Sequence, residues 1–336
     1  MTAPGLRGLA AVWVLMMFGG GGGVAAQQAS RTATGAAGVD AVRAARALVE
    51  ANRLGEAEAE LRGELARDPG SAAAMYLLGY VLERENRPRD SLAMFTQAAA
   101  IAPPRAEDLR LVALDYVLLD DYADALRWVT RATAMDPKNA EAFYTLGRIE
   151  MHDGNFVGAE RSFRRTLALN AKHTKAWDNL GLSMEAQNRA GEALAAYTEA
   201  IGTQVGADAG AAGRRTEQPY LNKGALLIAQ NRAGEAVGLL TEAVRISPEC
   251  ARCHEQLARA DLATGELGGA QKEMREAIRL DPSNPRLHYQ LGQMLRHAGL
   301  AAEADAELKR SAALYGSHSA EPEGDAPKAP GSGAQK

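Results

Sequence analysis

The sequence has 336 residues, of which 46% are apolar and 5% aromatic, and its formal net charge is −4 at pH 7. This length and apolar content allow either two average domains or one elongated array with a substantial core. The small negative charge and the pI near 6.0 give no global reason to expect a nucleic-acid-binding protein. The abundance of Ala, Leu, Glu and Arg, which lose little side-chain freedom in helices, favours an all-α fold.

Residues 1–26 have the pattern of a secretory signal peptide. Arg7 precedes ten apolar residues, 9–18, which are followed by five glycines and a short stretch of small residues. A cut after Ala26 would leave Gln27 as the first residue of the mature protein. An uncleaved anchor is the alternative, but ten apolar residues are too few to span a bilayer comfortably. We therefore expect an exported protein, periplasmic or secreted, with no membrane span after signal removal.

From residue 38 onwards the sequence repeats with a period of 34 residues. Units begin at residues 38, 72, 106, 140 and 174 and, after nine extra residues, at 217, 251 and 285. Four units carry Leu-Gly at their seventh and eighth positions, all carry a small residue at the twentieth, and five carry proline near their end. Small residues let two helix backbones approach closely, and proline cannot continue a helix. The pattern predicts eight helix pairs that must stack on their neighbours to bury their apolar faces.

These positions closely resemble the tetratricopeptide repeat family, whose unit is a pair of antiparallel helices. The resemblance covers about residues 38–315. It implies an all-α, right-handed α-solenoid of about eight 34-residue helix-turn-helix repeats. Within each unit, Gly and Asn residues are expected to supply the turn between the two helices.

The repeats fall into two blocks, with repeats one to five over residues 38–207 and repeats six to eight over residues 217–315. The extra residues 208–216 are either a tolerated surface insertion or a hinge between the blocks. Two flanking segments, 27–37 and 316–336, are rich in Ala, Gly, Ser and Pro and have few large apolar residues. We expect both flanking segments to be disordered.

The segment Cys-Ala-Arg-Cys-His at residues 250–254 has the spelling of a covalent haem attachment site. His254 occupies the fourth position of repeat seven, and His288 occupies the same position in repeat eight with no cysteine nearby. We therefore interpret His254 as a packed ring, and Cys250 and Cys253 as a disulfide or dithiol at a helix start. On this interpretation the protein has no cofactor. A thiol-redox or c-type haem protein, with His254 as a haem ligand, is the alternative.

Other chemistry has no clear signature in the sequence. It contains no G-x-x-x-x-G-K, G-x-S-x-G or H-E-x-x-H motif, and its six histidines are dispersed. Carboxylates such as Glu56, Glu192 and Glu235 recur directly before the small residue of the second helix, which is typical of a solvated helix face. We expect no enzyme and no metal site. A regulatory fragment of a larger enzyme is a further alternative, although no catalytic module is present.

The family resemblance implies that the first helices line a concave groove, with positions 2, 5, 9, 12 and 13 of each repeat exposed in it. In repeats two to four these positions include Tyr76, Tyr80, Arg84, Arg110, Tyr144, Arg148 and His152. Tyrosine and arginine are over-represented among residues that dominate binding energy. Repeat six offers an apolar patch at Leu221 and Ile228 instead. We expect a non-catalytic scaffold that binds a protein or peptide, an envelope-assembly partner or a polysaccharide.

Overall fold

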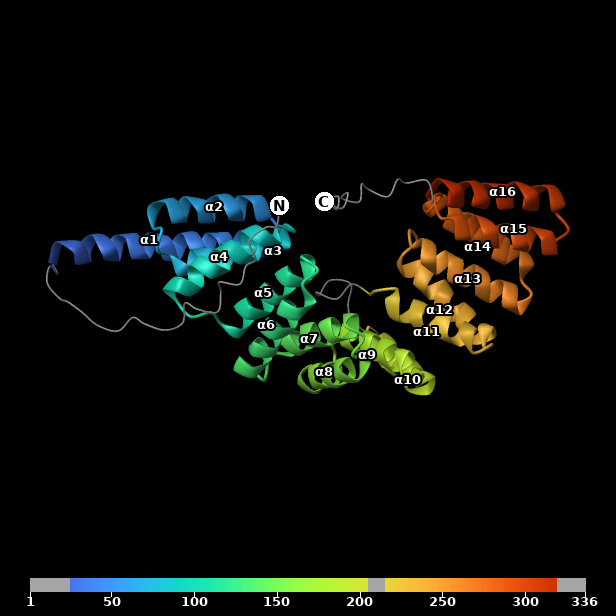
Figure 1. The fold of residues 1–336 in the computed structure, drawn as a ribbon, viewed down its shortest axis with the longest axis horizontal. Helices are drawn as coiled ribbons and strands as arrows, with labels where there is room; N and C mark the ends of the chain where they lie inside the picture. Colours follow the sequence, from blue (N-terminus) through green and yellow to red (C-terminus); the bar gives the residue numbers. More distant parts are fainter. Residues whose placement is uncertain (1–24, 205–214, 319–336) are drawn as a thin grey trace, which may run out of the picture. The chain divides into compact units, whose positions relative to one another are not determined.

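The computed structural model describes residues 25–204 and 215–318 of the chain. These residues form helices and no strands, and they belong to two compact units that divide between Ala171 and Lys172 (Figure 1). The first unit contains α1 (Ala25–Glu50), α2 (Leu54–Arg67), α3 (Ala72–Arg84), α4 (Pro88–Ile101), α5 (Ala106–Leu118), α6 (Tyr122–Met135), α7 (Ala140–His152) and α8 (Phe156–Leu169). The second unit contains α9 (Thr174–Ala186), α10 (Ala190–Gly202), α11 (Gln218–Ala229), α12 (Ala233–Ile246), α13 (Ala251–Thr264), α14 (Leu267–Leu280), α15 (Pro285–His297) and α16 (Ala301–His318).

The helices follow the predicted repeats closely. Six first helices begin at the residue where the sequence predicted a new repeat, namely Ala72, Ala106, Ala140, Thr174, Ala251 and Pro285. Helix α11 begins at Gln218, one residue after the predicted start at residue 217. Consecutive helices pair within each repeat, as Figure 1 shows for both units. The prediction of an all-α fold built from helix-turn-helix repeats is confirmed.

The turn within each repeat depends on one residue with a left-handed backbone. Among the described residues, positive φ angles occur only at the fifteenth position of a repeat, at Asn52, Asn86, Asp120, Gly154, Asn188, Asn231, Gly265 and Gly299. Glycine, asparagine and aspartate adopt this conformation more readily than other residues, because glycine lacks a Cβ and the other two have short polar side chains. The expectation that Gly and Asn form these turns is confirmed, and Asp120 does the same in repeat three.

The two helices of a repeat pack through positions 8 and 24. A Cβ on Gly181 would lie 2.4 Å from the ring of Tyr197, whose side chain is fully buried, and a Cβ on Gly147 would lie 2.7 Å from the ring of Phe163. Repeat three has alanine at position 8 and the smaller Val129 at position 24. Repeats with an aromatic ring at position 24 therefore have glycine at position 8, because the ring occupies the space that a side chain at position 8 would need in a closely packed interior.

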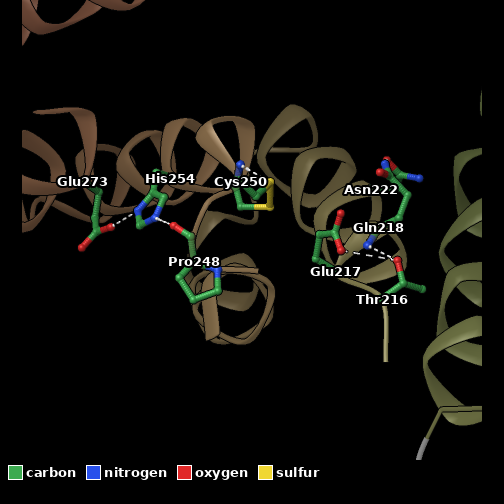
Figure 2. Close-up of a disulfide and its surroundings, with 9 residues drawn as sticks. Thr216, Glu217, Gln218, Asn222, Pro248, Cys250, His254 and Glu273 are labelled. Carbon is green, nitrogen blue, oxygen red and sulfur yellow. Dashed lines mark hydrogen bonds and ion pairs between the residues drawn. A yellow bond between two sulfur atoms is a disulfide. The ribbon is translucent and has the colours of Figure 1, made fainter. Parts of the chain in front are cut away.

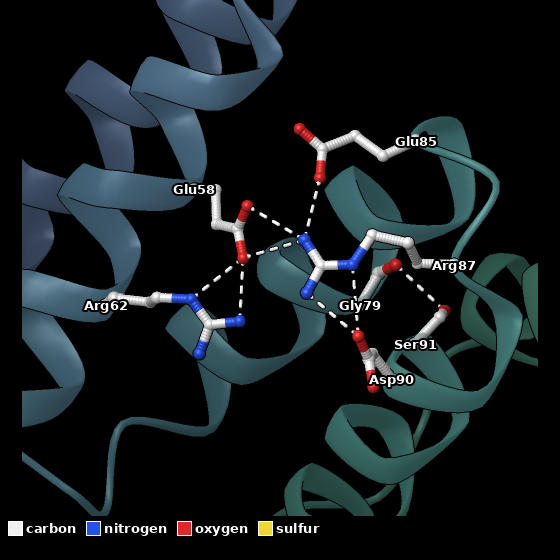
Figure 3. Close-up of polar contacts among 7 residues, drawn as sticks. All are labelled: Glu58, Arg62, Gly79, Glu85, Arg87, Asp90 and Ser91. Carbon is white, nitrogen blue, oxygen red and sulfur yellow. Dashed lines mark hydrogen bonds and ion pairs between the residues drawn. The ribbon is translucent and has the colours of Figure 1, made fainter.

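Arg87 connects repeats one and two. Its Nη1 lies 3.0 Å from Oε2 of Glu58 in α2, and its Nη2 lies 2.8 Å from Oδ2 of Asp90 (Figure 3). The Arg87 side chain is 37% exposed, so solvent screens each of these ion pairs and weakens it. Beneath it, Ser91 donates a hydrogen bond of 2.9 Å to the carbonyl oxygen of Gly79, which joins the two helices of repeat two.

The boundaries at the two ends differ from the prediction. Residues 27–37, predicted as a disordered linker, instead form the first part of α1. Their high alanine content accounts for this, since alanine has the highest helix propensity and the segment continues directly into the packed half of the helix. Helix α16 runs to His318, past the predicted end of repeat eight at residue 315.

Three sequence predictions fall mostly or wholly outside the described residues. These are the signal peptide at 1–26, apart from its last two residues, and the insertion or hinge at 208–216, apart from its last two residues. The tail is the third, from residue 319 to the end of the chain.

Candidate functional site

A groove lies on the first-helix face of repeats one to three. It has a volume of about 600 Å³ and is lined by residues of α1, α3, α5 and the segment that precedes α5. Of the predicted groove residues, Tyr76, Tyr80 and Arg110 contribute to it. The three side chains come from two successive first helices, so repeat stacking brings them to one surface.

Tyr76 and Tyr80 present aromatic surface from α3. The hydroxyl of Tyr76 donates a hydrogen bond of 2.7 Å to the carbonyl oxygen of Ala102, and its ring is tilted against Phe95 with centroids 6.1 Å apart. Burial raises the pKa of Tyr76 to about 12, so the hydroxyl stays protonated. The guanidinium of Arg84 lies 5.9 Å from the centre of the Tyr80 ring. Both rings are therefore held in place before any ligand binds.

Arg110 is paired within the protein. Its side chain is 14% exposed and lies on Glu107, with Nε donating to Oε2 at 2.9 Å and Nη2 donating to Oε1 at 2.5 Å. Burial alone would lower the pKa of Arg110, but the hydrogen bonds and charge of Glu107, with Glu141 and Glu83 nearby, raise it. A ligand carboxylate would have to compete with Glu107 for this arginine.

Repeat four reproduces part of this arrangement. The ring of Tyr144 is tilted against Phe163 with centroids 6.0 Å apart, as Tyr76 is against Phe95. The guanidinium of Arg148 lies 5.9 Å from the centre of the Tyr144 ring. Both residues lie on α7, the next first helix after α5. His152 instead stacks on Tyr122 of α6, with ring centroids 3.7 Å apart, and so contacts a second helix of the preceding repeat.

The groove also contains residues that the sequence analysis missed. Arg46 and Glu50 of α1 line it and occupy the ninth and thirteenth positions of repeat one. The same positional rule would have found them had it been applied to that repeat. Arg105 and Asp108 line the groove at the start of α5, where Arg105 Nη2 lies 2.8 Å from Asp108 Oδ1. No positional signal identified this pair.

The predicted apolar patch of repeat six is not available for binding. Leu221 is 2% exposed and belongs to the core formed by α11, α12 and α13, and Ile228 packs against the same core. The position rule fails here because the neighbouring first helices cover this stretch of α11. In repeat eight, by contrast, Tyr289 is 51% exposed, and the Arg296 side chain is 57% exposed.

The two cysteines lie together at the start of α13 and form a disulfide (Figure 2). Cys250 is the N-cap residue of the helix, and its Sγ accepts a hydrogen bond of 3.1 Å from the backbone N–H of Cys253. Cys253 is fully buried in the core around α12 and α13. The sequence allowed either a disulfide or a dithiol at this helix start, and the structure contains the disulfide.

His254 is buried, with both ring nitrogens in hydrogen bonds. Nδ1 lies 2.6 Å from Oε2 of Glu273, and Nε2 lies 3.1 Å from the carbonyl oxygen of Pro248 (Figure 2). Both ring nitrogens are therefore engaged by groups of the protein. The two sulfurs are bonded to each other. These residues do not fit a covalent haem.

Metal-binding clusters and membrane-spanning helices are both absent from the described part of the chain. It contains no group of three or more His, Cys, Asp or Glu side chains placed to hold a metal ion. Within residues 25–204 and 215–318, no helix has the length and apolar content needed to cross a membrane.

Solved structures with a similar fold come from several proteins. A tetratricopeptide repeat protein from Parabacteroides merdae is 18% identical with a TM-score of 0.56, over 77% of this chain and 98% of its own. PilF of Pseudomonas aeruginosa is 17% identical with a TM-score of 0.56, over 66% of this chain and 97% of its own. PilW is 22% identical with a TM-score of 0.51, over 61% of this chain and 92% of its own. At these identities the likeness shows the fold alone.

No curated protein sequence matches the chain. The family model of the tetratricopeptide repeat matches residues 42–106, 113–165, 154–212 and 255–318. These segments cover more than half of the sequence, on the same helix pairs that the structure shows. The chain therefore belongs to the tetratricopeptide repeat family.

Proposed function

We propose that the protein is a non-catalytic scaffold that binds an extended segment of a partner protein along the first helices of repeats one to four. The observation that carries this proposal is the groove of about 600 Å³ with Tyr76 and Tyr80 fixed in its wall. Tyrosines in fixed rotamers lose little conformational entropy on binding and offer a large contact area. Tyr144 and Arg148 on α7 extend the same kind of surface to the next repeat.

The charged groups of the groove support binding rather than catalysis. Glu107 is paired with Arg110, and Asp108 is paired with Arg105. The pKa of Glu107 is lowered, because the hydrogen bonds and charge of Arg110 outweigh the effect of burial. A carboxylate held ionised in this way is a poor proton donor at neutral pH. Each of these ion pairs can break so that its two side chains pair instead with charged groups of a bound peptide.

We further propose that the protein is exported and acts in the cell envelope or outside the cell. The order of charged, apolar and small residues in the first 26 positions supports export. The Cys250–Cys253 disulfide supports it as well, since disulfides persist in oxidising compartments. PilW, whose fold is similar, is a type IV pilus biogenesis factor, which is the precedent for proposing an envelope-assembly partner.

The binding proposal is tested with the exported protein and the partners that co-purify with it. Tyr80→Ala and Arg148→Ala should each weaken binding of the purified partner by about 1 to 2 kcal/mol, in the range of interface hot spots. Glu192→Ala, on the exposed face of α10, is the matched control and should leave binding unchanged. Circular dichroism confirms that each variant is folded. Equal affinities for all folded variants would exclude this face as the binding site.

The location has a separate test. The full-length chain is produced in a host that exports proteins, and the mature protein is recovered from the periplasm or the medium. Its mass should correspond to a chain that begins at Gln27. Recovery of the uncut chain from the cytoplasm alone would contradict the proposal of export without affecting the binding test.

A further inference from the structure

A second cavity lies between α4, α5 and α6 of the first unit. It has a volume of about 320 Å³, and its walls include the aromatic side chains of Tyr76, Phe95, Tyr116 and Trp128. Leu92 of α4 and Val112 of α5 add aliphatic surface. Tyr76 also lines the groove described above, so its side chain separates the two spaces. Two second helices, α4 and α6, contribute to the wall of this cavity, whereas the helices that line the groove are first helices.

The sequence explains why repeat two leaves this space open. Ala99 lines the cavity and stands at position 28 of its repeat. Five other repeats carry a larger aliphatic residue at that position, namely Leu65, Leu167, Ile201, Val244 and Ile278. In all five of those repeats the side chain packs against a core cluster or is itself buried. The alanine therefore removes the group that fills the corresponding space elsewhere in the chain.

The polar groups on the cavity wall already have partners in the protein. The Tyr76 hydroxyl donates to Ala102, and Asp108 is paired with Arg105. Thr96 donates a hydrogen bond to the carbonyl oxygen of Leu92, and Arg131, which also lines the cavity, has an interaction within the protein. A ligand with its own charge would lose its hydration without gaining a partner from these groups, which is unfavourable. The wall therefore selects for an apolar, uncharged ligand.

We propose that this cavity binds a small neutral molecule that contains an aromatic ring. The volume is at the lower end of ligand pockets, which range over about 300–1,000 Å³. Apolar cavities of about 150 Å³ in other proteins already accept benzene, so a space of about twice that volume can hold a bicyclic ring system. Four aromatic side chains in the wall favour a ring over a flexible chain, because offset and edge-to-face ring contacts add to the burial of area. This site is a separate space from the peptide-binding groove, although Tyr76 and Asp108 line both.

The test uses Prodan, a neutral naphthalene fluorophore whose emission shifts to the blue in apolar surroundings. We expect the full chain to bind one equivalent of Prodan. Ala99→Leu introduces the residue that repeats one and four carry at this position and should weaken binding at least tenfold. Its melting temperature should rise, because the new side chain fills the cavity. Ala66→Leu makes the same chemical change on an exposed position of α2 and should leave binding unchanged.

Competition defines the ligand class. 2-Naphthol should displace Prodan at lower concentration than 1-decanol, and the reverse order would show that the site prefers alkyl chains and would overturn the proposed preference for a ring. If the Ala99→Leu variant does not fold, Ala99→Val, which introduces the residue present at position 28 of repeat six, replaces it. Undiminished Prodan binding by the folded Ala99 variant, equal loss in the Ala66 variant, or no binding by the unmodified chain would each overturn the proposal.

Discussion

Repeats seven and eight bury a histidine in the same way, although only repeat seven carries the two cysteines. In repeat seven His254 contacts Glu273 and the carbonyl oxygen of Pro248 at 2.6 and 3.1 Å. In repeat eight His288 contacts Glu307 and the carbonyl oxygen of Pro282 at 2.7 and 3.2 Å. Glutamate lies nineteen residues after the histidine in both repeats, and proline lies six residues before it. The histidine of the haem-like segment therefore belongs to the repeat, and the disulfide is an addition to it.

The largest expected effect comes from removing either histidine. His254→Ala and His288→Ala should each lower the free energy of unfolding by about 2 to 4 kcal/mol, because each leaves a cavity and removes two hydrogen bonds of a buried ring. Urea unfolding followed by circular dichroism measures both. If the histidine has the same role in repeats seven and eight, the two losses of unfolding free energy should be similar. A loss confined to His254 would show that its role depends on the cysteines.

The buried carboxyl of Asp115 has fewer hydrogen-bond partners than either of these histidines. Asp115 is fully buried, its Oδ2 lies 2.6 Å from Ser91 Oγ, and its Oδ1 has no hydrogen-bond partner. Burial raises the pKa of Asp115 to about 8 from an ordinary value of 3.8. The folded state thus holds this proton to higher pH than the unfolded state. Stability from this group is greatest below about pH 4 and is lost as the pH rises to about 8.

Asp115→Asn should therefore raise the free energy of unfolding by about 2 kcal/mol at pH 9, since it removes the buried charge. At pH 4 the variant and the unmodified protein should differ much less. Asp153→Asn, at an exposed position between α7 and α8, is the control and should change neither value. Chemical unfolding at several pH values gives the result, and an unchanged pH dependence in Asp115→Asn would assign that dependence to another group.

The smallest expected effect comes from the disulfide itself. It joins residues three apart, so it removes little freedom from the unfolded chain and should contribute less than about 2 kcal/mol. Replacing both Cys250 and Cys253 by alanine should leave the fold intact, as repeat eight is without cysteines. Mass spectrometry of the unmodified protein should show the loss of two hydrogens and no added haem. Unfolding of the double variant would show that repeat seven, unlike repeat eight, depends on its cross-link.

The sequence by itself determined the repeat architecture. Helix starts such as Ala106 and Pro285, the turn at position 15 and the pairing of Gly181 with Tyr197 all follow from local rules of backbone conformation and side-chain volume. The interpretation of His254 as a packed ring also came from sequence, because His288 occupies the same position.

Only the tertiary structure decided which of the predicted surface residues are accessible. Leu221 is buried against neighbouring helices, although it satisfied the same positional rule as Tyr80, which lines the groove. Such outcomes depend on which side chains of adjacent repeats come within contact distance, and the position of a residue in its own repeat does not specify its neighbours. The cavity beside Ala99 has the same origin, since a missing side chain leaves space only where the surrounding helices do not close over it.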